Sequence, residues 1–156
     1  MVVGLLLPQL VLAVGADDPA PNCKLKSLQQ DALVDLNYQG KVTYVDFWAS
    51  WCGPCAQSMP FMNEMSQQLA GQGFNLVAVN MDENRQDAEA FLSKHPVSFS
   101  IVADIDGQCA GAFGVQAMPS SYLIDRHGKV RHVQLGFHDS ERDEIRQKVR
   151  ALLAEP

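Results

Sequence analysis

Apolar positions along the chain follow two patterns, continuous short runs and spacings of three or four residues. The runs at 42–48 and 74–81 fit strands buried on both faces, and the first is interrupted by Asp46. The wider spacing recurs at 54–69 and 85–94, where it predicts helices with one apolar face. The pattern therefore predicts two strand–helix units in succession.

Shorter elements are expected on either side of these units. In chain order they are a strand near 24–28, a polar segment at 29–40 that is helical in part, an extended segment at 97–103, a short helix at 108–113, and hairpin strands at 120–124 and 129–137. The last helix is expected to be capped by Ser140 and to carry an apolar stripe of Ile145, Val149 and Leu152. Strands that alternate with helices and end in a hairpin predict an α/β fold with a mixed central sheet flanked by helices.

Length and composition are those of one globular domain. The chain has 156 residues, of which 47% are hydrophobic and 19% charged. Its net charge is −6 and no basic run or face appears, which argues against binding to nucleic acid or to an anionic membrane. No apolar stripe is left over once the elements are assigned, so we expect a monomer.

The N-terminus carries a separate signal. Residues 2–14 are almost entirely apolar but too short to span a bilayer comfortably, and this length fits the apolar core of a secretory signal. Small residues suit cleavage after Ala16, so 1–16 is expected to be a signal peptide, truncated because no Lys or Arg precedes the apolar run. The alternatives are an uncleaved anchor and a native cytosolic N-terminus. A flexible lead-in at 17–23 and a domain at 24–156 are expected to follow.

The strongest chemical signal is Trp51-Cys52-Gly53-Pro54-Cys55, which lies between a predicted strand and a predicted helix. Two thiols separated by two residues close into a small disulfide ring that exchanges with other disulfides. Cys52 would start the helix, where unpaired N–H groups and the helix dipole favour the reactive thiolate. Cys52 is therefore expected to be the nucleophile and Cys55 the resolving cysteine. The alternative, a permanent disulfide, is disfavoured because so small a ring stabilises little.

A C-x-x-C pair is also half of a zinc site, but such a site needs two further ligands, usually a second close pair. The remaining cysteines, Cys23 and Cys109, are isolated, and none of the four histidines forms a ligand pair near a cysteine. We therefore expect neither a metal nor another cofactor. Cys23 and Cys109 either form a disulfide that ties the N-terminal arm to the core or remain separate thiols, and the sequence leaves both open.

Beyond the cysteine pair, residues 45–55 resemble the active-site segment of thioredoxins. Pro60 matches the proline that kinks their active-site helix, and Met118-Pro119 matches the cis-proline that faces their disulfide. A longer insertion before this proline, together with the residues at 119–125, resembles the TlpA/ResA branch. That branch comprises exported thioredoxin-like reductases of bacteria.

The resemblance covers about residues 24–154 and implies a thioredoxin-like fold with thiol-disulfide oxidoreductase activity. It implies that Asp46 accepts the proton of Cys55 through water, the alternative being an aspartate at a strand end that reaches solvent. It also implies that Pro119 is cis, and not an ordinary trans-proline of a loop. The backbone of Met118 would then be exposed to pair with a client peptide.

The resemblance further implies how the protein is used. Trp51 would contact the client, and Gly53 and Pro54 would set the potential, favouring a reductant because strong oxidants of this fold keep a His there. The implied protein reduces client proteins that carry disulfides, lies in the periplasm or another extracytoplasmic compartment, and is re-reduced by a membrane electron donor. Cytochrome c maturation is one implied role. The alternatives are a disulfide-forming oxidase and a copper chaperone that uses Cys52 and Cys55 as soft ligands.

Three positions depart from the relatives. Ser58 stands where many TlpA/ResA proteins carry a Glu, and Ala78 where thioredoxin keeps a Lys beside its buried Asp. Both changes alter the acid–base surroundings of the thiols. Residues 117–120 lack the Gly-Ala-Pro-Glu signature of the cytochrome c maturation reductases, which weakens that assignment.

Overall fold

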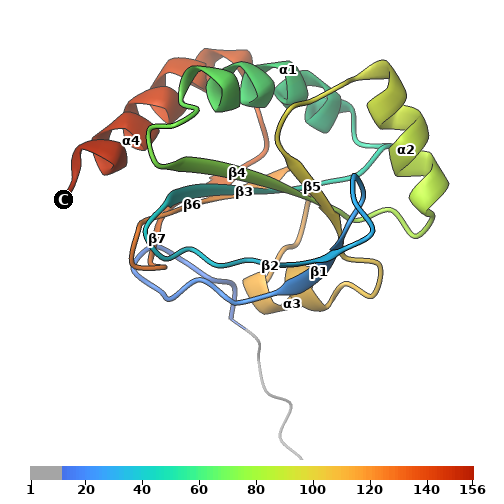
Figure 1. The fold of residues 1–156 in the computed structure, drawn as a ribbon, viewed down its shortest axis with the longest axis horizontal. Coiled ribbons are helices and arrows are strands. Elements are labelled where there is room, and N and C mark those ends of the chain that lie inside the picture. Colours follow the sequence, from blue (N-terminus) through green and yellow to red (C-terminus); the bar gives the residue numbers. More distant parts are fainter. Residues whose placement is uncertain (1–11) are drawn as a thin grey trace, which may run out of the picture.

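The computed structural model describes residues 12–156, which form a seven-stranded sheet with helices on both faces (Figure 1). In chain order the elements are β1 (Lys24–Ser27), β2 (Leu33–Asp35), β3 (Val42–Trp48), α1 (Gly53–Gln68), β4 (Phe74–Asn80), α2 (Arg85–Lys94), β5 (Ser100–Ala103), α3 (Gln108–Phe113), β6 (Ser120–Ile124), β7 (Val130–Leu135), a 3-10 turn (Asp139–Glu141) and α4 (Arg142–Ala154). This arrangement confirms the predicted thioredoxin-like α/β fold.

The sheet is mixed, and its strand order is β2-β1-β5-β4-β3-β6-β7. The central strands β3, β4 and β5 run parallel, whereas β6 pairs antiparallel with β3. The carboxyl ends of the three parallel strands therefore meet at one edge of the sheet, where β6 begins. This places the loop from β3 to α1 beside the loop that enters β6.

Two hydrophobic cores lie on opposite faces of the sheet. Helices α1, α2 and α4 cover one face, and α3 covers the other (Figure 1). The whole of β3 is buried between these layers, as its apolar run predicts. The predicted stripe of α4 is also confirmed, since Ile145, Val149 and Leu152 are buried.

The prediction of helix within 29–40 is wrong. The described chain forms no helix there, because it turns back after β1 and β2 pairs antiparallel with β1, with Leu25 opposite Val34. The turn is held by the Ser27 N–H, which donates to the Ala32 carbonyl oxygen at 2.9 Å. Pairing with β1 thus supplies the backbone hydrogen bonds of a segment whose polar sequence carries no helical spacing.

The predicted cap of the last helix is also wrong. Ser140 lies inside the 3-10 turn, and α4 begins at Arg142 without a side-chain cap. The Glu141 side chain reaches back instead and accepts a hydrogen bond from the His138 N–H at 3.0 Å. The helix therefore begins one residue later than a cap at Ser140 predicts, and a 3-10 turn precedes it.

Most of the predicted signal peptide lies outside the described residues. Of residues 17–23, expected to be a flexible lead-in, 17–20 run beside the start of β7. The Asp17 N–H donates to the Val130 carbonyl oxygen at 2.8 Å, and the Val130 N–H donates to the Asp18 carbonyl oxygen at 2.9 Å. Among the described residues, no helix combines the length and apolar character that crossing a membrane requires.

Candidate active site

The two closely spaced cysteines lie at the junction of β3 and α1. Cys52 is the residue before the helix, Cys55 is in its first turn, and the two sulfur atoms are bonded at 2.13 Å. The Cys55 N–H also donates to the Cys52 Sγ at 3.3 Å. Cys52 is 5% exposed and Cys55 fully buried, so an incoming disulfide reaches Cys52 first. The N–H donor and the helix start both favour negative charge on Cys52 after reduction.

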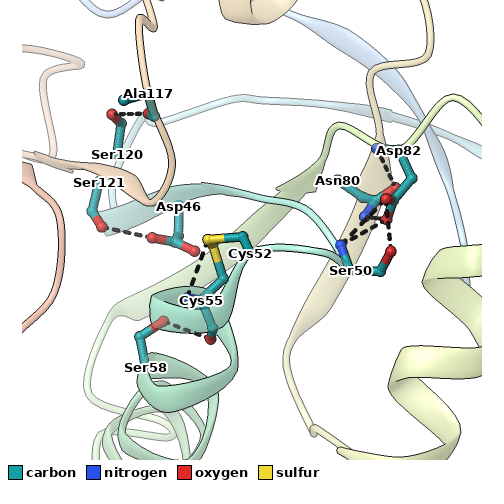
Figure 2. The surroundings of a disulfide bond; sticks show 10 residues. All are labelled: Asp46, Ser50, Cys52, Cys55, Ser58, Asn80, Asp82, Ala117, Ser120 and Ser121. Atoms are coloured by element: carbon teal, nitrogen blue, oxygen red, sulfur yellow. Dashed lines mark hydrogen bonds between the residues drawn. A yellow bond between two sulfur atoms is a disulfide. The ribbon is translucent and has the colours of Figure 1, made fainter.

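A buried carboxylate fixes the loop that carries Cys52. Asp82, two residues beyond the end of β4, accepts hydrogen bonds from the Ser50 N–H at 3.0 Å and the Ser50 hydroxyl at 2.8 Å. The Asn80 side chain donates to the same carboxylate at 2.7 Å. Figure 2 shows this cluster on one side of the cysteine pair. Ser50 lies two residues before Cys52, so Asp82 holds the approach to the nucleophile in place.

Asp46 lies on the other side of the pair, and its carboxylate points toward the cysteines (Figure 2). It is 1% exposed, and one oxygen accepts a 2.6 Å hydrogen bond from the Ser121 hydroxyl on β6. The other oxygen, Oδ2, is buried without a partner in the described structure. Burial raises the pKa of Asp46 to about 7, against a partial lowering by the Ser121 bond. The group can therefore take up or release a proton near neutral pH.

Ala78 is the neighbour of Asp46 on β4 and is fully buried. It leaves no cation at the position where thioredoxins keep a lysine. The hydroxyl of Ser58, the other departure, donates to the Cys55 carbonyl oxygen at 3.0 Å. Its place within the first turns of α1 brings it under the resolving cysteine (Figure 2).

Replacing Asp46 with Asn is expected to stabilise the protein at pH 8 by roughly 1–3 kcal/mol, below a ceiling of about 4 kcal/mol set by the size of the pKa shift. The folded protein keeps the Asp46 proton up to about pH 7, whereas the unfolded chain releases it near 3.8. The folded state binds more protons in that window, so the free energy of unfolding falls as the pH rises through it. Urea denaturation at pH 5 and pH 8 should show that the free energy of unfolding changes less with pH in the variant than in the wild-type protein.

The control for this prediction is Asp125→Asn. Burial opposes ionisation of Asp125, but hydrogen bonds from backbone N–H groups and from Arg131 together outweigh it and lower the pKa of Asp125, so its titration lies on the acid side of the window. This variant should keep the slope above pH 4. An unchanged slope in Asp46→Asn would contradict the account of a protonated, buried Asp46.

The peptide bond between Met118 and Pro119 is cis and leads into β6. Trp51, directly before the nucleophile, is 72% exposed, whereas Trp48 is fully buried. Gly53 and Pro54 open α1, and a Cβ added at Gly53 would meet no atom within 4 Å. The structure thus brings an exposed aromatic ring and the start of a helix together at one edge of the sheet.

The second cysteine pair is bonded as well. Cys23, directly before β1, and Cys109, in α3, form a disulfide with an S–S distance of 2.00 Å, and their Cα atoms are 5.7 Å apart. Of the two alternatives that the sequence leaves open, the structure has the bonded one. The bond fastens the N-terminal arm to α3, so it lies apart from the exchange site.

The sequence did not single out Ser121, Ser50 or Asp82. Ser121 meets Asp46 only because β6 pairs with β3, and the two residues are 75 positions apart in the chain. One signal was available for Asp82, a charged residue immediately beyond an apolar strand at the edge where the active-site loop also lies.

Comparison with known proteins links this geometry to a chemistry. Residues 15–149 match the redoxin family. The thiol-disulfide oxidoreductase ResA of Geobacillus thermodenitrificans is 34% identical over 140 residues, which are 90% of this chain and 79% of that protein. ResA of Bacillus subtilis is 32% identical over 125 residues, covering 80% of this chain and 69% of that protein.

Solved structures agree in fold. A crystal structure assigned as the thiol:disulfide interchange protein DsbE from Chlorobium tepidum matches with a TM-score of 0.87 and 40% identity, covering 91% of this chain and all of that one (100%). A solution structure from Bacteroides thetaiotaomicron, assigned as a protein disulfide isomerase, matches with a TM-score of 0.81 and 25% identity, covering 92% of this chain and 96% of that one.

Proposed function

Because this chain belongs to the redoxin family, among its TlpA/ResA-like thiol-disulfide oxidoreductases, we propose that it is an exported reductase of protein disulfides. Its class of activity, thiol-disulfide exchange with substrates that carry disulfides, follows from these relatives. We propose three further points: the direction of electron flow, the residues that perform the exchange and the compartment. The main support for the proposal is the position of Cys52 at the start of α1, with Cys55 buried behind it.

The reaction begins from the dithiol form. The Cys52 thiolate attacks one sulfur of the client disulfide, forming a mixed disulfide and releasing the other client sulfur as a thiolate that takes up a proton. Cys55 then loses its proton and attacks the Cys52 sulfur, which releases the second client thiol. The client gains two electrons and two protons, and the Cys52–Cys55 disulfide is left. A membrane electron donor returns two electrons, and two protons taken up from solvent restore the dithiol form and complete the cycle.

Asp46 is the residue that we propose takes the Cys55 proton. Its free Oδ2 is buried and its carboxylate points toward the cysteines (Figure 2). The pKa of about 7 suits a group that accepts a proton in one step and releases it before the next. Because Ala78 supplies no cation, the hydroxyl of Ser121 is the one hydrogen-bond donor to this carboxylate in the described structure.

Client contact is proposed at the edge of the sheet around the cis-proline. Trp51 offers an exposed ring, and the backbone of Met118 would pair with an extended client strand beside the exchanging sulfurs. Gly53 and Pro54 favour the reducing direction, because a thioredoxin-type dipeptide accompanies low potentials. Export is supported by the apolar N-terminal sequence and by the similarity to ResA and DsbE. We propose that the protein acts as a monomer.

The direction of exchange can be tested on one client in both redox states. The purified dithiol form is mixed with an oxidised client protein, and the disulfide form with the reduced client, and free thiols are alkylated and counted by mass. We expect the dithiol form to become oxidised almost completely while the disulfide form leaves the reduced client unchanged. The opposite result would assign the protein as an oxidase.

A further inference from the structure

Tyr44 is a buried titratable residue close to Asp46. It lies on β3 two residues before Asp46, so the two side chains point to the same face of the sheet. The Tyr44 ring packs in the core under α1, α2 and α4 and is 4% exposed. Its direct neighbours across the sheet, Leu76 on β4 and Leu123 on β6, are apolar. The phenol must therefore find a polar partner farther along a neighbouring strand.

This partner is the hydroxyl of Ser121 on β6. In the register of β3 and β6, Ser121 lies opposite Asp46, which makes it the diagonal neighbour of Tyr44 and places it within reach of an aromatic side chain. A hydrogen bond between the side chains of Tyr44 and Ser121 partly lowers the pKa of the phenol. Tyr44, Ser121 and Asp46 thus form one connected chain of hydrogen bonds.

The direction of the two bonds follows from the number of hydrogens available. The ionised carboxylate of Asp46 can only accept, so it takes the single hydrogen of the Ser121 hydroxyl, at 2.6 Å. Ser121 then has only lone pairs to offer, and the phenol of Tyr44 donates. Burial raises the pKa of Tyr44, and the negative charges of Asp46 and Glu141 raise it further, so the phenol keeps the hydrogen that it donates.

The carboxylate of Asp46 depends on this chain for its polar support. Ala78 places only a methyl group beside it on β4, and its other oxygen, Oδ2, has no partner in the described structure. The orientation and strength of the Ser121 bond therefore decide how readily Asp46 ionises. A hydroxyl that also accepts from a phenol is a stronger and better fixed donor, because each bond polarises the next.

We propose that Tyr44 is a positioning residue of the exchange site, whose phenol fixes the Ser121 hydroxyl on Asp46 and so stabilises the ionised carboxylate that receives the Cys55 proton. The inference rests on the proposed function, since it explains how the proton acceptor is kept ready. Tyr44 acts through Ser121, so removing the phenol hydroxyl should matter only while Ser121 is present.

The test follows the Asp46 carboxyl carbon by NMR in the ¹³C-labelled full chain, from pH 5 to pH 10 and without a client, with Asp46→Asn to identify the signal. Tyr44→Phe should raise the midpoint of this titration by about half a pH unit. Ser121→Ala should raise it by roughly one to two units, and the double variant no further. Tyr122→Phe is the matched control, because it removes a buried hydroxyl that donates to the Phe113 carbonyl oxygen at 3.3 Å in the opposite core, and it should leave the midpoint unchanged.

The rate of client reduction gives a second readout, which a loss of packing alone would not produce. In Tyr44→Phe the rate should fall about twofold at pH 7, where fewer Asp46 carboxylates are ionised, and should equal that of the wild-type protein by pH 9. A midpoint that stays or falls in Tyr44→Phe, an equal rise in Tyr122→Phe, or shifts that add in the double variant would overturn the inference. A rate profile that ignores a shifted Asp46 midpoint would instead overturn the role of Asp46 in the proposed function.

Discussion

Replacing Cys52 with Ser is expected to abolish the reduction of client disulfides, lowering the rate by at least about 1,000-fold. A hydroxyl at the start of α1 stays protonated at neutral pH and cannot attack sulfur as a thiolate does. The remaining thiol, Cys55, is fully buried and cannot reach a protein disulfide itself. The initial rate of client reduction in the presence of a small-molecule reductant measures the effect.

Cys55→Ser is the matched variant, because it keeps the nucleophile and removes the resolving thiol. It should also turn over slowly, but it should accumulate a covalent complex with the client that dithiothreitol releases. Cys52→Ser should form no such complex. If Cys55→Ser failed to trap the client while Cys52→Ser trapped it, the two roles would have to be exchanged.

The second large effect is expected from removing the Cys23–Cys109 disulfide. The bond joins residues 86 positions apart, so the loop that it closes in the unfolded chain has a high conformational entropy. The double variant Cys23→Ser with Cys109→Ser should lose roughly 2–5 kcal/mol of unfolding free energy. Urea denaturation under non-reducing conditions gives the value.

The active-site disulfide is the internal control for that measurement. Cys52 and Cys55 are 3 positions apart, so replacing both with Ser removes a loop constraint of only roughly 2 kcal/mol. The variant without Cys23 and Cys109 should also keep client reduction when it is folded, because this bond lies apart from the exchange site. Equal losses of stability from the two double variants would contradict the structural role.

Strong local patterns predicted much of the fold. The run at β3 and the spacing at α2 gave the bounds that the structure has, because several residues in each repeat the same signal. β2 was missed because a strand of 3 residues carries too short a pattern, and it forms only by pairing with β1. The role of Ser140 was predicted wrongly because a serine is common both as a helix cap and within a short turn, and here it lies inside the 3-10 turn.

The active site likewise has parts that the sequence predicts and parts that it does not. The cysteine pair is adjacent in sequence and could be predicted, whereas the Ser121–Asp46 and Ser50–Asp82 bonds depend on which strands pair. Whether Cys23 bonds to Cys109 is a question of distance between an N-terminal arm and a distant helix, which spacing does not encode.

The reduction potential of the Cys52–Cys55 couple tests the central claim most directly. The variant without Cys23 and Cys109 isolates this couple, and it is equilibrated with dithiothreitol or glutathione buffers before its thiols are alkylated and counted. We predict a value near or below about −250 mV, since thioredoxin lies near −270 mV. A value near about −120 mV, that of a strong periplasmic oxidant, would contradict the reductase assignment and make this protein a disulfide donor.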